Sequence, residues 1–319
     1  MPRKIRWGVL GVAKIAVKQV IPAMQQGEFC EVVAIASRDA EKARLAAETL
    51  GIARAHASYE ALLADPLVDA VYIPLPNHMH VPWATKCAQA GKHVLCEKPI
   101  GLSSAEAREL IAVRDITGVK IGEAFMARVH PQWQRAKELA HSGEIGQLRV
   151  ISGHFSYFNA DPQNIRNQPA MGGGGLMDIG CYPITLSRMV FGEEPVRAFG
   201  RMDRDSKMGT DRLASAILEF PSGQCTFTCS TQLVPYQKMN LFGTRGRIEV
   251  EIPFNAPVDR PTRLFVNDTV VEIPICNQYT IQGDLFSRAI LENGPVPVPL
   301  EDSLRNMLVI EAIAKSGNE

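Results

Sequence analysis

Between residues 5 and 126, short apolar segments alternate with amphipathic ones, and this alternation limits the possible folds more than any other feature of the sequence. The apolar segments predict strands at 5–10, 32–36, 70–73, 93–96 and 120–126. Helices are predicted between them, the first ending at Met24 and the others at 40–51, 59–64, 81–90 and 103–117. Because every connection is short, the pattern indicates an α/β fold with a doubly wound parallel sheet.

A glycine fingerprint follows the first predicted strand. Residues 11–16 read G-x-A-x-x-A, where dinucleotide-binding proteins usually have G-x-G-x-x-G or G-x-G-x-x-A. Gly11 permits a tight turn, while Ala13 and Ala16 are small enough for a pyrophosphate and the sheet to approach the backbone. The motif is weak alone, but the strand at 32–36 completes a βαβ unit, and together they predict a dinucleotide cofactor.

The end of the second predicted strand bears on the choice of cofactor. NAD-specific proteins usually carry an acid there, whereas this chain reads Ser37-Arg38-Asp39. A hydroxyl and a guanidinium suit a 2′-phosphate, and Asp39 directly precedes a helix, where it is expected to be the N-cap. The sequence therefore predicts NADP(H), with Lys42 as a second phosphate contact and NAD(H) as a possible substitute.

Polar residues also follow the next predicted strands, at the sheet edge where parallel sheets present their chemistry. Glu97 and Lys98 come directly after the strand at 93–96, and Pro99 restricts Lys98 to extended conformations. The pair is consistent with a structural ion pair or with a catalytic site. Asn77, His78 and His80 follow the strand at 70–73 and are expected to line the cofactor. No third ligand with suitable spacing accompanies the histidines, so no metal site is predicted.

The second half of the chain has a different pattern. A helix is predicted at 131–143, and long strands at 148–158, 196–204, 212–220, 224–233, 238–242, 247–252 and 263–273. Turns such as Pro221-Ser222-Gly223 connect them, which indicates a large open, mostly antiparallel sheet. We therefore expect a dinucleotide-binding domain at 1–122 and an α+β substrate-binding and oligomerisation domain at 123–319, whose C-terminal helix can pack back on the first domain.

One strand of this sheet alternates clearly between two kinds of side chain. Cys225, Phe227 and Cys229 occupy one face, while Thr226 and Thr228 occupy the other. The apolar face is expected to pack on helices. The flatter polar face has two possible fates, burial in a homodimer or exposure to solvent.

Four consecutive glycines, residues 172–175, lead into a predicted helix that carries Asp178 and Tyr182. The glycines are consistent with a flexible hinge or with close approach of a ligand to the backbone. Asp178 and Tyr182 are four residues apart, hence on one face of the helix, although Pro183 distorts the helix there. They form either an acid/base pair or a capping aspartate beside a half-buried tyrosine.

Composition narrows the class of partner. Lysine plus arginine number 34, as do aspartate plus glutamate, so the formal net charge is zero and a nucleic-acid partner is not expected. The seven cysteines are odd in number and contain no C-x-x-C pair, which is typical of a reducing compartment. No apolar stretch is long enough for a bilayer, and no signal-peptide cleavage site follows the N-terminal segment. We expect a cytoplasmic protein with a small-molecule partner and no membrane association.

Five motifs, in order, resemble one family across nearly the whole chain: GVLGVAKIA, SRD, PLPNHMH, AGKHVLCEKP and GGGGLMDIGCYPI. This combination is similar to the glucose-fructose oxidoreductase, inositol dehydrogenase and MocA (Gfo/Idh/MocA) family. The resemblance implies an N-terminal Rossmann domain and a C-terminal domain with an open sheet, often used to form homodimers or higher homo-oligomers. It also implies hydride transfer between nicotinamide and a hydroxyl or carbonyl carbon, usually of a sugar or polyol.

The resemblance further implies residue roles. Lys98 is the catalytic lysine in a Lys98–Pro99 peptide expected to be cis, Asp178 is its polar partner, and Tyr182 is the acid/base where many members have histidine. Tyrosine at this position resembles the branch with dihydrodiol dehydrogenases, NADP-linked xylose dehydrogenases and some anhydrofructose reductases. Arg166 resembles an arginine beside the cofactor. The expected cofactor contacts are Gly11, Ala13, Lys14, Ile15, Ser37, Arg38, Lys42, Leu75, Asn77, His80, Glu97, Lys98 and Arg166.

The chemistry is consistent with these roles. A free phenol, with a pKa near ~10, is a weak base at neutral pH, and a neighbouring ammonium group such as that of Lys98 would favour the phenolate. The sequence thus predicts an NADP-dependent oxidoreductase acting on a sugar, an anhydro sugar or a related diol. The alternatives are an NAD-dependent glycosidase acting by transient oxidation and elimination, a non-enzymatic NADP-sensing regulator, and a reductase of nucleotide-linked keto sugars, for which Arg201, Arg204, Lys207 and Arg212 offer cations.

Overall fold

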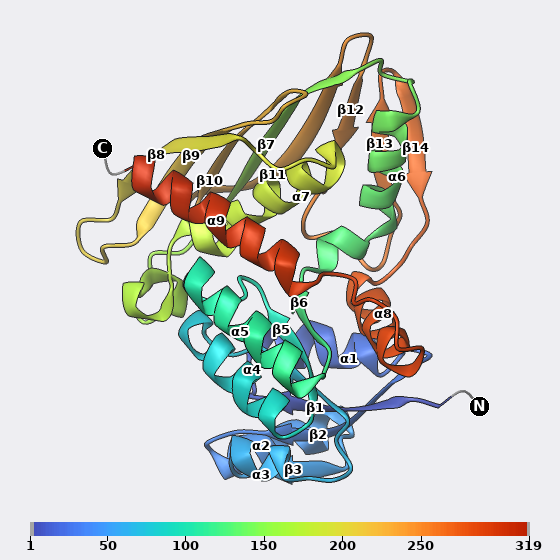
Figure 1. Ribbon diagram of the computed structural model, residues 1–319, viewed down its shortest axis with the longest axis vertical. Coiled ribbons are helices and arrows are strands. Elements are labelled where there is room, and N and C mark those ends of the chain that lie inside the picture. The colour runs from blue at the N-terminus through green and yellow to red at the C-terminus, as the bar shows by residue number, and fades with distance from the viewer. Residues whose placement is uncertain (1–2, 318–319) are drawn as a thin grey trace. The chain divides into compact units, whose positions relative to one another are not determined.

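The computed structural model describes residues 3–317 and divides into two compact units. The first contains the chain up to Met126 together with Asn277–Leu304, and the second contains Ala127–Cys276 with the remainder of the C-terminal segment (Figure 1). The predicted boundary after residue 122 lies four residues earlier than the observed one. The prediction also gave residues 277–304 to the second domain, whereas the structure groups them with the first unit.

Residues 277–304 are held in the first unit by contacts with the N-terminal part of the chain. The indole N–H of Trp7 donates to the hydroxyl of Ser287 over 3.0 Å, in the interior of the first unit. The carboxylate of Asp284 accepts the backbone N–H groups of Glu28 and Phe29. Because these partners lie more than 250 residues apart, no local pattern marks them.

The sheet of the first unit is parallel throughout, with the strand order β3-β2-β1-β4-β5-β6. Its strands are β1 (Ile5–Leu10), β2 (Cys30–Ala36), β3 (Arg54–His56), β4 (Ala70–Ile73), β5 (His93–Glu97) and β6 (Ile121–Ala124). Only the short β3 was not predicted. The order reverses between β1 and β4, which is the point where open α/β sheets bind ligands at their carboxyl edge.

The helices of the first unit are α1 (Ile21–Met24), α2 (Ala40–Leu50), α3 (Tyr59–Leu63), α4 (His80–Gln89), α5 (Ser104–Thr117) and α8 (Gln278–Leu291). Asp39 caps α2 as predicted, because its carboxylate accepts the backbone N–H of Lys42. The helix after the fingerprint differs from the prediction, since it opens as a π-helix, η1 (Ala16–Val20). Pro22 lies two residues after this π-helix and has no N–H for a regular i→i−4 bond, which accounts for the wider turn.

The second unit is built on eight strands in the order β14-β13-β12-β11-β7-β10-β9-β8. They are β7 (Leu148–Phe158), β8 (Arg197–Arg204), β9 (Asp211–Glu219), β10 (Gln224–Ser230), β11 (Gln232–Gly243), β12 (Arg247–Val250), β13 (Thr262–Val266) and β14 (Thr269–Ile273). All pairs are antiparallel except β7 with β10. The predicted mostly antiparallel sheet is confirmed.

Two predicted strands of this sheet were wrong. Residues 224–233 were expected to form a single strand, but β10 ends at Ser230 and β11 begins at Gln232. Residues 263–273 were expected to form a single strand, but they form β13 and β14, joined at Asn267 and Asp268. Asn267 has a φ of 53°, a left-handed conformation that asparagine tolerates better than most residues. A two-residue turn of this kind reverses the chain without glycine or proline, so the apolar residues on both sides looked continuous.

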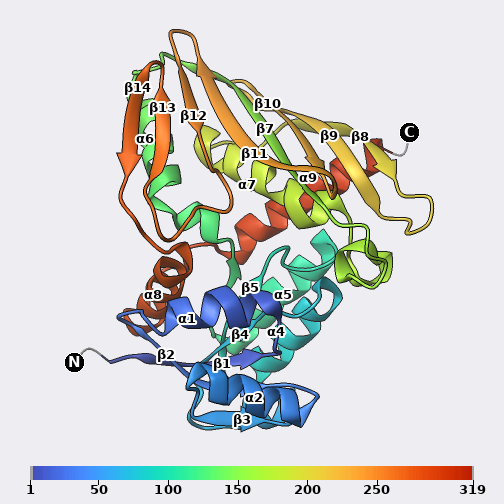
Figure 2. The ribbon, with the colours of Figure 1, turned by 180° about the vertical axis from the view of Figure 1, so that it is seen from behind.

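Helices cover one face of the second sheet. They are α6 (Pro131–His141), α7 (Cys181–Phe191) and α9 (Leu300–Ser316), the last of which begins in the first unit and ends in the second (Figure 1). Seen from behind, the strands lie in front of α6 and α7, and no helix of this unit covers that face in the described residues (Figure 2). The alternation predicted for β10 is confirmed, with Cys225, Phe227 and Cys229 buried. Among residues 3–317, no helix is long and apolar enough to cross a bilayer.

Candidate active site

The fingerprint of the first unit forms a tight turn at the end of β1. Gly11 has a φ of +104°, and its N–H donates to the carbonyl of Ala36 in β2 over 2.8 Å. A Cβ atom at this position would lie 3.1 Å from the side chain of Leu75 and 3.6 Å from the hydroxyl of Tyr59. Glycine is therefore favoured by the backbone conformation, and the loop after β4 packs against this turn.

The residues predicted to select the cofactor lie at the end of β2. The Ser37 hydroxyl is buried and accepts the N–H of Asp39, so it is held in place. Arg38 and Lys42 are exposed, and the ammonium group of Lys42 lies 3.7 Å from Asp39. Burial raises the pKa of Tyr59, and the nearby guanidinium of Arg38 opposes that shift. Tyr59 was not predicted as a site residue, and the structure places it beside both Gly11 and Arg38.

His80 lies between the loop after β4 and the loop after β5. Its ring is fully buried, with Nδ1 2.8 Å from the carbonyl oxygen of Pro99 and Nε2 2.7 Å from that of Leu75. Burial lowers the pKa of this imidazole to about 4, although the two carbonyl groups oppose the shift. The ring links the loop after β4 to the loop after β5. We therefore expect the predicted part of His80 in cofactor binding to be indirect, through the placement of these loops.

Glu97 is the last residue of β5, and Lys98 follows it at the same edge of the parallel sheet. The hydroxyl of Tyr72 in β4 donates to Glu97 over 2.7 Å, and burial together with this carboxylate raises the pKa of Tyr72 well above its usual value. Burial raises the pKa of Tyr279 in α8 to about 12, with Glu97 adding to the effect and Lys98 opposing it. The Lys98–Pro99 peptide is cis, as the family resemblance implied.

In the second unit, Asp178 is the centre of a polar cluster. It lies on a π-helix, η6 (Leu176–Gly180), that precedes α7. The hydroxyl of Tyr157 donates to Asp178 Oδ2 over 2.6 Å, and the Nε of Arg166 donates to the same oxygen over 2.9 Å. The negative charge of Asp178 raises the pKa of Arg166. Tyr157 was not predicted as a site residue, and the structure makes it the second donor to the predicted carboxylate.

Tyr182 is held by aromatic side chains. Its residue surface is 4% exposed, and its ring centroid lies 5.7 Å from that of Phe155 and 5.4 Å from that of Phe254. Tyr182 also lies close enough to Arg166 to contribute to the raised pKa of that guanidinium. The phenol therefore has a fixed ring in the same unit as Asp178, consistent with the predicted acid/base pair. Pro183 follows the π-helix, as Pro22 follows η1, and explains its widened turn.

Two of the four glycines, Gly173 and Gly174, pack closely in the structure, which differs from the flexible hinge considered above. A Cβ at Gly173 would lie 2.5 Å from the carbonyl oxygen of Arg166. Gly174 has a φ of +122°, and a Cβ there would lie 2.0 Å from Asp211 Oδ1. The same carboxylate accepts the N–H of Leu176 over 2.6 Å, and burial raises the pKa of Asp211 to about 6. Asp211 on β9 thus holds the turn that leads to Asp178.

Two of the four cations considered for a nucleotide-linked substrate, Arg212 and Arg204, have protein partners. Arg212 pairs with Asp203 over 2.9 Å, and Arg204 donates to the carbonyl of Gly209. Arg201 lies apart from the glycine turn, on the helix-free face of the sheet. In residues 3–317, no group of three or more histidine, cysteine, aspartate or glutamate side chains is arranged to hold a metal ion.

Four residues of the candidate site were not predicted from the sequence, and the reason is the same for each. Tyr59, Tyr72, Tyr157 and Asp211 each act through a partner on another strand or loop. A signal was present for Tyr157, because strict alternation along β7 places it on the same face as Phe155. No comparable signal marked Asp211, whose partner Leu176 is 35 residues away.

Comparison with known proteins gives the same assignment from both halves of the chain. Residues 5–125 match the model of the oxidoreductase family with an NAD-binding Rossmann fold, and residues 133–249 match the Gfo/Idh/MocA C-terminal domain. The chain belongs to the Gfo/Idh/MocA oxidoreductase family. The predicted family and the predicted two-part fold are thereby confirmed, and the protein is an NAD(P)-dependent oxidoreductase.

Relatives in this family act on several substrates. The chain is 47% identical to the uncharacterized oxidoreductase ORF334 of Rhizobium meliloti, covering 98% of this chain and 96% of the relative. It is 39% identical to D-xylose 1-dehydrogenase (NADP(+)) 2 of Haloferax volcanii, covering 97% and 96%. It is 33% identical to the mouse (Mus musculus) trans-1,2-dihydrobenzene-1,2-diol dehydrogenase, covering 85% and 80%.

Solved structures of the family are also similar. Aldose-aldose oxidoreductase from Caulobacter crescentus, complexed with glycerol, matches with a TM-score of 0.91 at 28% identity, over 99% of this chain and 98% of that one. A 3-ketoreductase from Actinomadura kijaniata, in complex with NADP and TDP-benzene, matches with a TM-score of 0.90 at 31% identity, over 98% of each chain.

Proposed function

We propose that this protein is an NADP-dependent oxidoreductase of sugars, anhydro sugars or related diols, of the aldose 1-dehydrogenase or keto-sugar reductase type. The observation that carries the proposal is the polar cluster of the second unit, in which Tyr157 and Arg166 hold the carboxylate of Asp178 four residues before the buried Tyr182. This arrangement supplies a fixed phenol and a fixed carboxylate. The NADP-linked xylose dehydrogenase among the relatives adds support.

The proposed mechanism assigns one task to each residue. NADP(H), when bound, accepts or supplies the hydride. Tyr182 exchanges the proton of the substrate hydroxyl, because a hydride leaves a carbinol carbon only as that proton departs. Lys98 stabilises the charge that develops on the substrate oxygen and favours the phenolate form of Tyr182. Asp178 provides the negative charge that orients the cationic groups of the site.

The proposed cofactor preference rests on the end of β2. The exposed Arg38 and Lys42 offer a guanidinium and an ammonium group to a 2′-phosphate, and the hydroxyl of Ser37 offers a further donor. Lys14 is exposed, and Ala13 and Ile15 are partly exposed, which suits contact with a pyrophosphate near Gly11. Asn77 is also partly exposed, on the loop after β4.

Turnover of a substrate panel tests the proposal. The protein is incubated with NADP and a series of aldoses, with NADPH and keto or anhydro sugars, and with diols and a nucleotide-linked keto sugar, while absorbance of the reduced nicotinamide is followed. Lys98→Ala and Tyr182→Phe should each lower kcat about 100-fold or more and leave NADP affinity within about threefold. Near-wild-type turnover in both variants would contradict the assigned roles.

Two results would favour the other functions. Hydrolysis of aryl glycosides with no net change in the reduced cofactor would identify a glycosidase acting by transient oxidation. Tight binding of NADP with no turnover of any compound would identify a regulator. Activity in a cytoplasmic fraction, compared with secreted and membrane fractions, tests the proposed cytoplasmic location.

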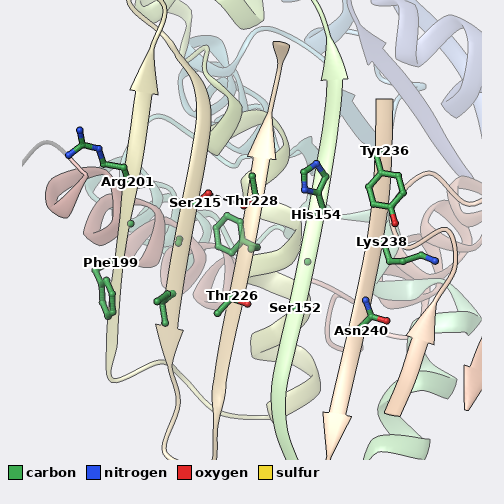
Figure 3. Close-up of a pocket in the computed structure, with 15 residues that line it drawn as sticks. Ser152, His154, Phe199, Arg201, Ser215, Thr226, Thr228, Tyr236, Lys238 and Asn240 are labelled. Atoms are coloured by element: carbon green, nitrogen blue, oxygen red, sulfur yellow. Dashed lines mark hydrogen bonds between the residues drawn. The ribbon is translucent and has the colours of Figure 1, made fainter. Parts of the chain in front are cut away.

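We further propose that a second copy of this chain covers the helix-free face of the eight-stranded sheet. A shallow groove of about 680 Å³ runs over this face. Figure 3 shows its side chains standing on β7, β8, β9, β10 and β11: Ser152, His154, Phe199, Arg201, Ser215, Thr226, Thr228, Tyr236, Lys238 and Asn240. Half of them are serine, threonine or asparagine, and these short side chains leave room for the same face of another copy to pack against this one.

A further inference from the structure

The hydroxyl of Tyr157 donates a hydrogen bond to Asp178, and the proposed mechanism gives this hydroxyl no task. The O–H···O distance is 2.6 Å, within the range of bonds from a hydroxyl to a charged carboxylate. Arg166 donates to the same oxygen, Oδ2, over 2.9 Å. One carboxylate oxygen of Asp178 therefore accepts hydrogen bonds from both a neutral phenol and a guanidinium, and these two bonds fix the orientation of the carboxylate.

The two donors differ in how firmly they are held. Arg166 lies on a short 3-10 helix, η4 (Ile165–Asn167), and its side chain is 45% exposed. Tyr157 lies on β7, which pairs with β10 on one side and β11 on the other. Its neighbour Ser156 pairs with both of these strands. The phenol is thus the donor that ties Asp178 to the middle of the sheet.

The same face of β7 also positions Tyr182. Residues of one strand face alternate, so Gly153, Phe155 and Tyr157 lie on the helix-covered face. A Cβ at Gly153 would lie 3.3 Å from Pro183 Cβ, and the ring of Phe155 packs against that of Tyr182. One strand face therefore supports both predicted site residues, the phenol through packing and the carboxylate through a hydrogen bond.

We propose that Tyr157 is a positioning residue of the active site, whose hydroxyl orients the carboxylate of Asp178 for the reaction. This inference rests on the proposed function, in which the negative charge of Asp178 orients the cationic groups of the active site. If Tyr157 only filled space on β7, a phenylalanine with the same ring would serve equally well. Tyr157→Phe separates the two cases, since it removes only the hydroxyl.

The contact is tested without a substrate by fluorine NMR of protein labelled with 3-fluorotyrosine. The chain has six tyrosines, and the resonance of Tyr157 is the one that disappears in Tyr157→Phe. In Asp178→Asn this resonance should shift by more than its linewidth, because its acceptor loses its charge. The resonance of Tyr72, whose hydroxyl donates to Glu97 in the first unit, is the control and should stay in place. An unmoved Tyr157 resonance would overturn the proposal.

The kinetic test is a double-mutant cycle with a compound from the panel that the wild-type protein turns over. Tyr157→Phe should lower kcat about tenfold, the effect of losing one charge-assisted hydrogen bond, and leave the KM for NADP unchanged. In the Asp178→Asn background the same change should alter kcat by less than about twofold, because the group it orients is gone. An unchanged kcat in Tyr157→Phe, or an equal loss in both backgrounds, would overturn the proposal.

Failure of the proposed function gives a different result. If no compound of the panel is turned over, the proposed reaction fails, while the fluorine resonance still decides whether the hydroxyl of Tyr157 holds Asp178. If a compound is turned over and the cycle shows no coupling, the proposed function stands and the role of Tyr157 fails.

Discussion

A single buried carboxyl group, that of Asp211, accepts the N–H of Leu176 and occupies the space beside Gly174 that a side chain would need. The guanidinium of Arg204 on β8 lowers the pKa of Asp211. The thiol of Cys229 on β10 also faces this region, and burial, Asp211 and Asp178 all raise the pKa of that thiol. Burial is the largest influence and raises the pKa of Asp211 to about 6. Ionisation of this group therefore costs folding free energy.

The pH dependence of stability follows from that shift. An acid whose pKa is raised from 3.8 to about 6 binds its proton more tightly in the folded state. The free energy of unfolding should thus fall by about 2.5 kcal/mol as pH rises from about 4 to about 7. The variant Asp211→Asn has no titrating group at this position. The free energy of unfolding of the wild type minus that of the variant should therefore fall by about this amount between pH 4 and pH 7 in urea denaturation. Parallel pH profiles for the two proteins would contradict the assignment.

The proposed preference for NADP also depends on single side chains. Arg38 is exposed at the end of β2, and a planar guanidinium there would suit phosphate oxygens. Arg38→Ala should raise the KM for NADP about 10- to 100-fold and change the KM for NAD less than about threefold, since a phosphate contact worth about 1.5–3 kcal/mol is lost. Steady-state kinetics with both cofactors measures this. Arg135→Ala, which removes a surface guanidinium from α6, is the control.

At the scale of elements, the glycine turn and η6 form one unit of structure with β9. Gly174 and Gly192 both have positive φ, but only Gly174 has a close neighbour, since no atom lies within 4 Å of a Cβ at Gly192. Gly192→Ala should destabilise the protein by about 1 kcal/mol, the backbone penalty alone. Gly174→Ala adds a clash with Asp211 and should cost at least about 3 kcal/mol and lower turnover. Denaturant unfolding of both variants tests this, and equal losses would contradict the close packing.

Strand β7 shows how much an element pattern can predict. Its bounds were predicted correctly, from Leu148 to Phe158, and its two faces follow the pleat. One face carries Phe155 and Tyr157 toward Tyr182 and Asp178, and the other contributes Ser152 and His154 to the groove. The pattern therefore predicted the strand, but the partners of each face depended on which helices and strands lie next to it.

At the scale of the whole molecule, the helix-free sheet face is the surface proposed to bind a second copy. Thr226 stands in the groove, where arginine would add bulk and charge next to Arg201 and Lys238. Thr226→Arg should convert the wild-type oligomer into a monomer, because like charges would meet across the interface. Thr49→Arg, at an exposed position of α2, is the matched control. Size-exclusion chromatography with light scattering measures the mass, and a monomeric wild type or an unchanged mass in Thr226→Arg would contradict the interface.

Much of this molecule could be predicted from local sequence. The parallel sheet followed from the alternation of apolar and amphipathic segments, the turn at Gly11 from the conformational freedom of glycine, and the cap at Asp39 from its place before a helix. Each of these depends on residues within about one element of each other. The split of 263–273 into two strands failed because Asn267 turns the chain without the usual signals.

By itself, the sequence determined most strands of a doubly wound parallel sheet, the family, and which residue types could carry the chemistry. Only the tertiary structure decided that Tyr157 holds Asp178, that Asp211 holds the glycine turn, and that α8 belongs to the first unit. The physical reason is the range of the interactions. Periodicity and capping act over a few residues, whereas a buried hydrogen bond joins whichever groups the folded chain brings within about 3 Å, however far apart they lie in the sequence.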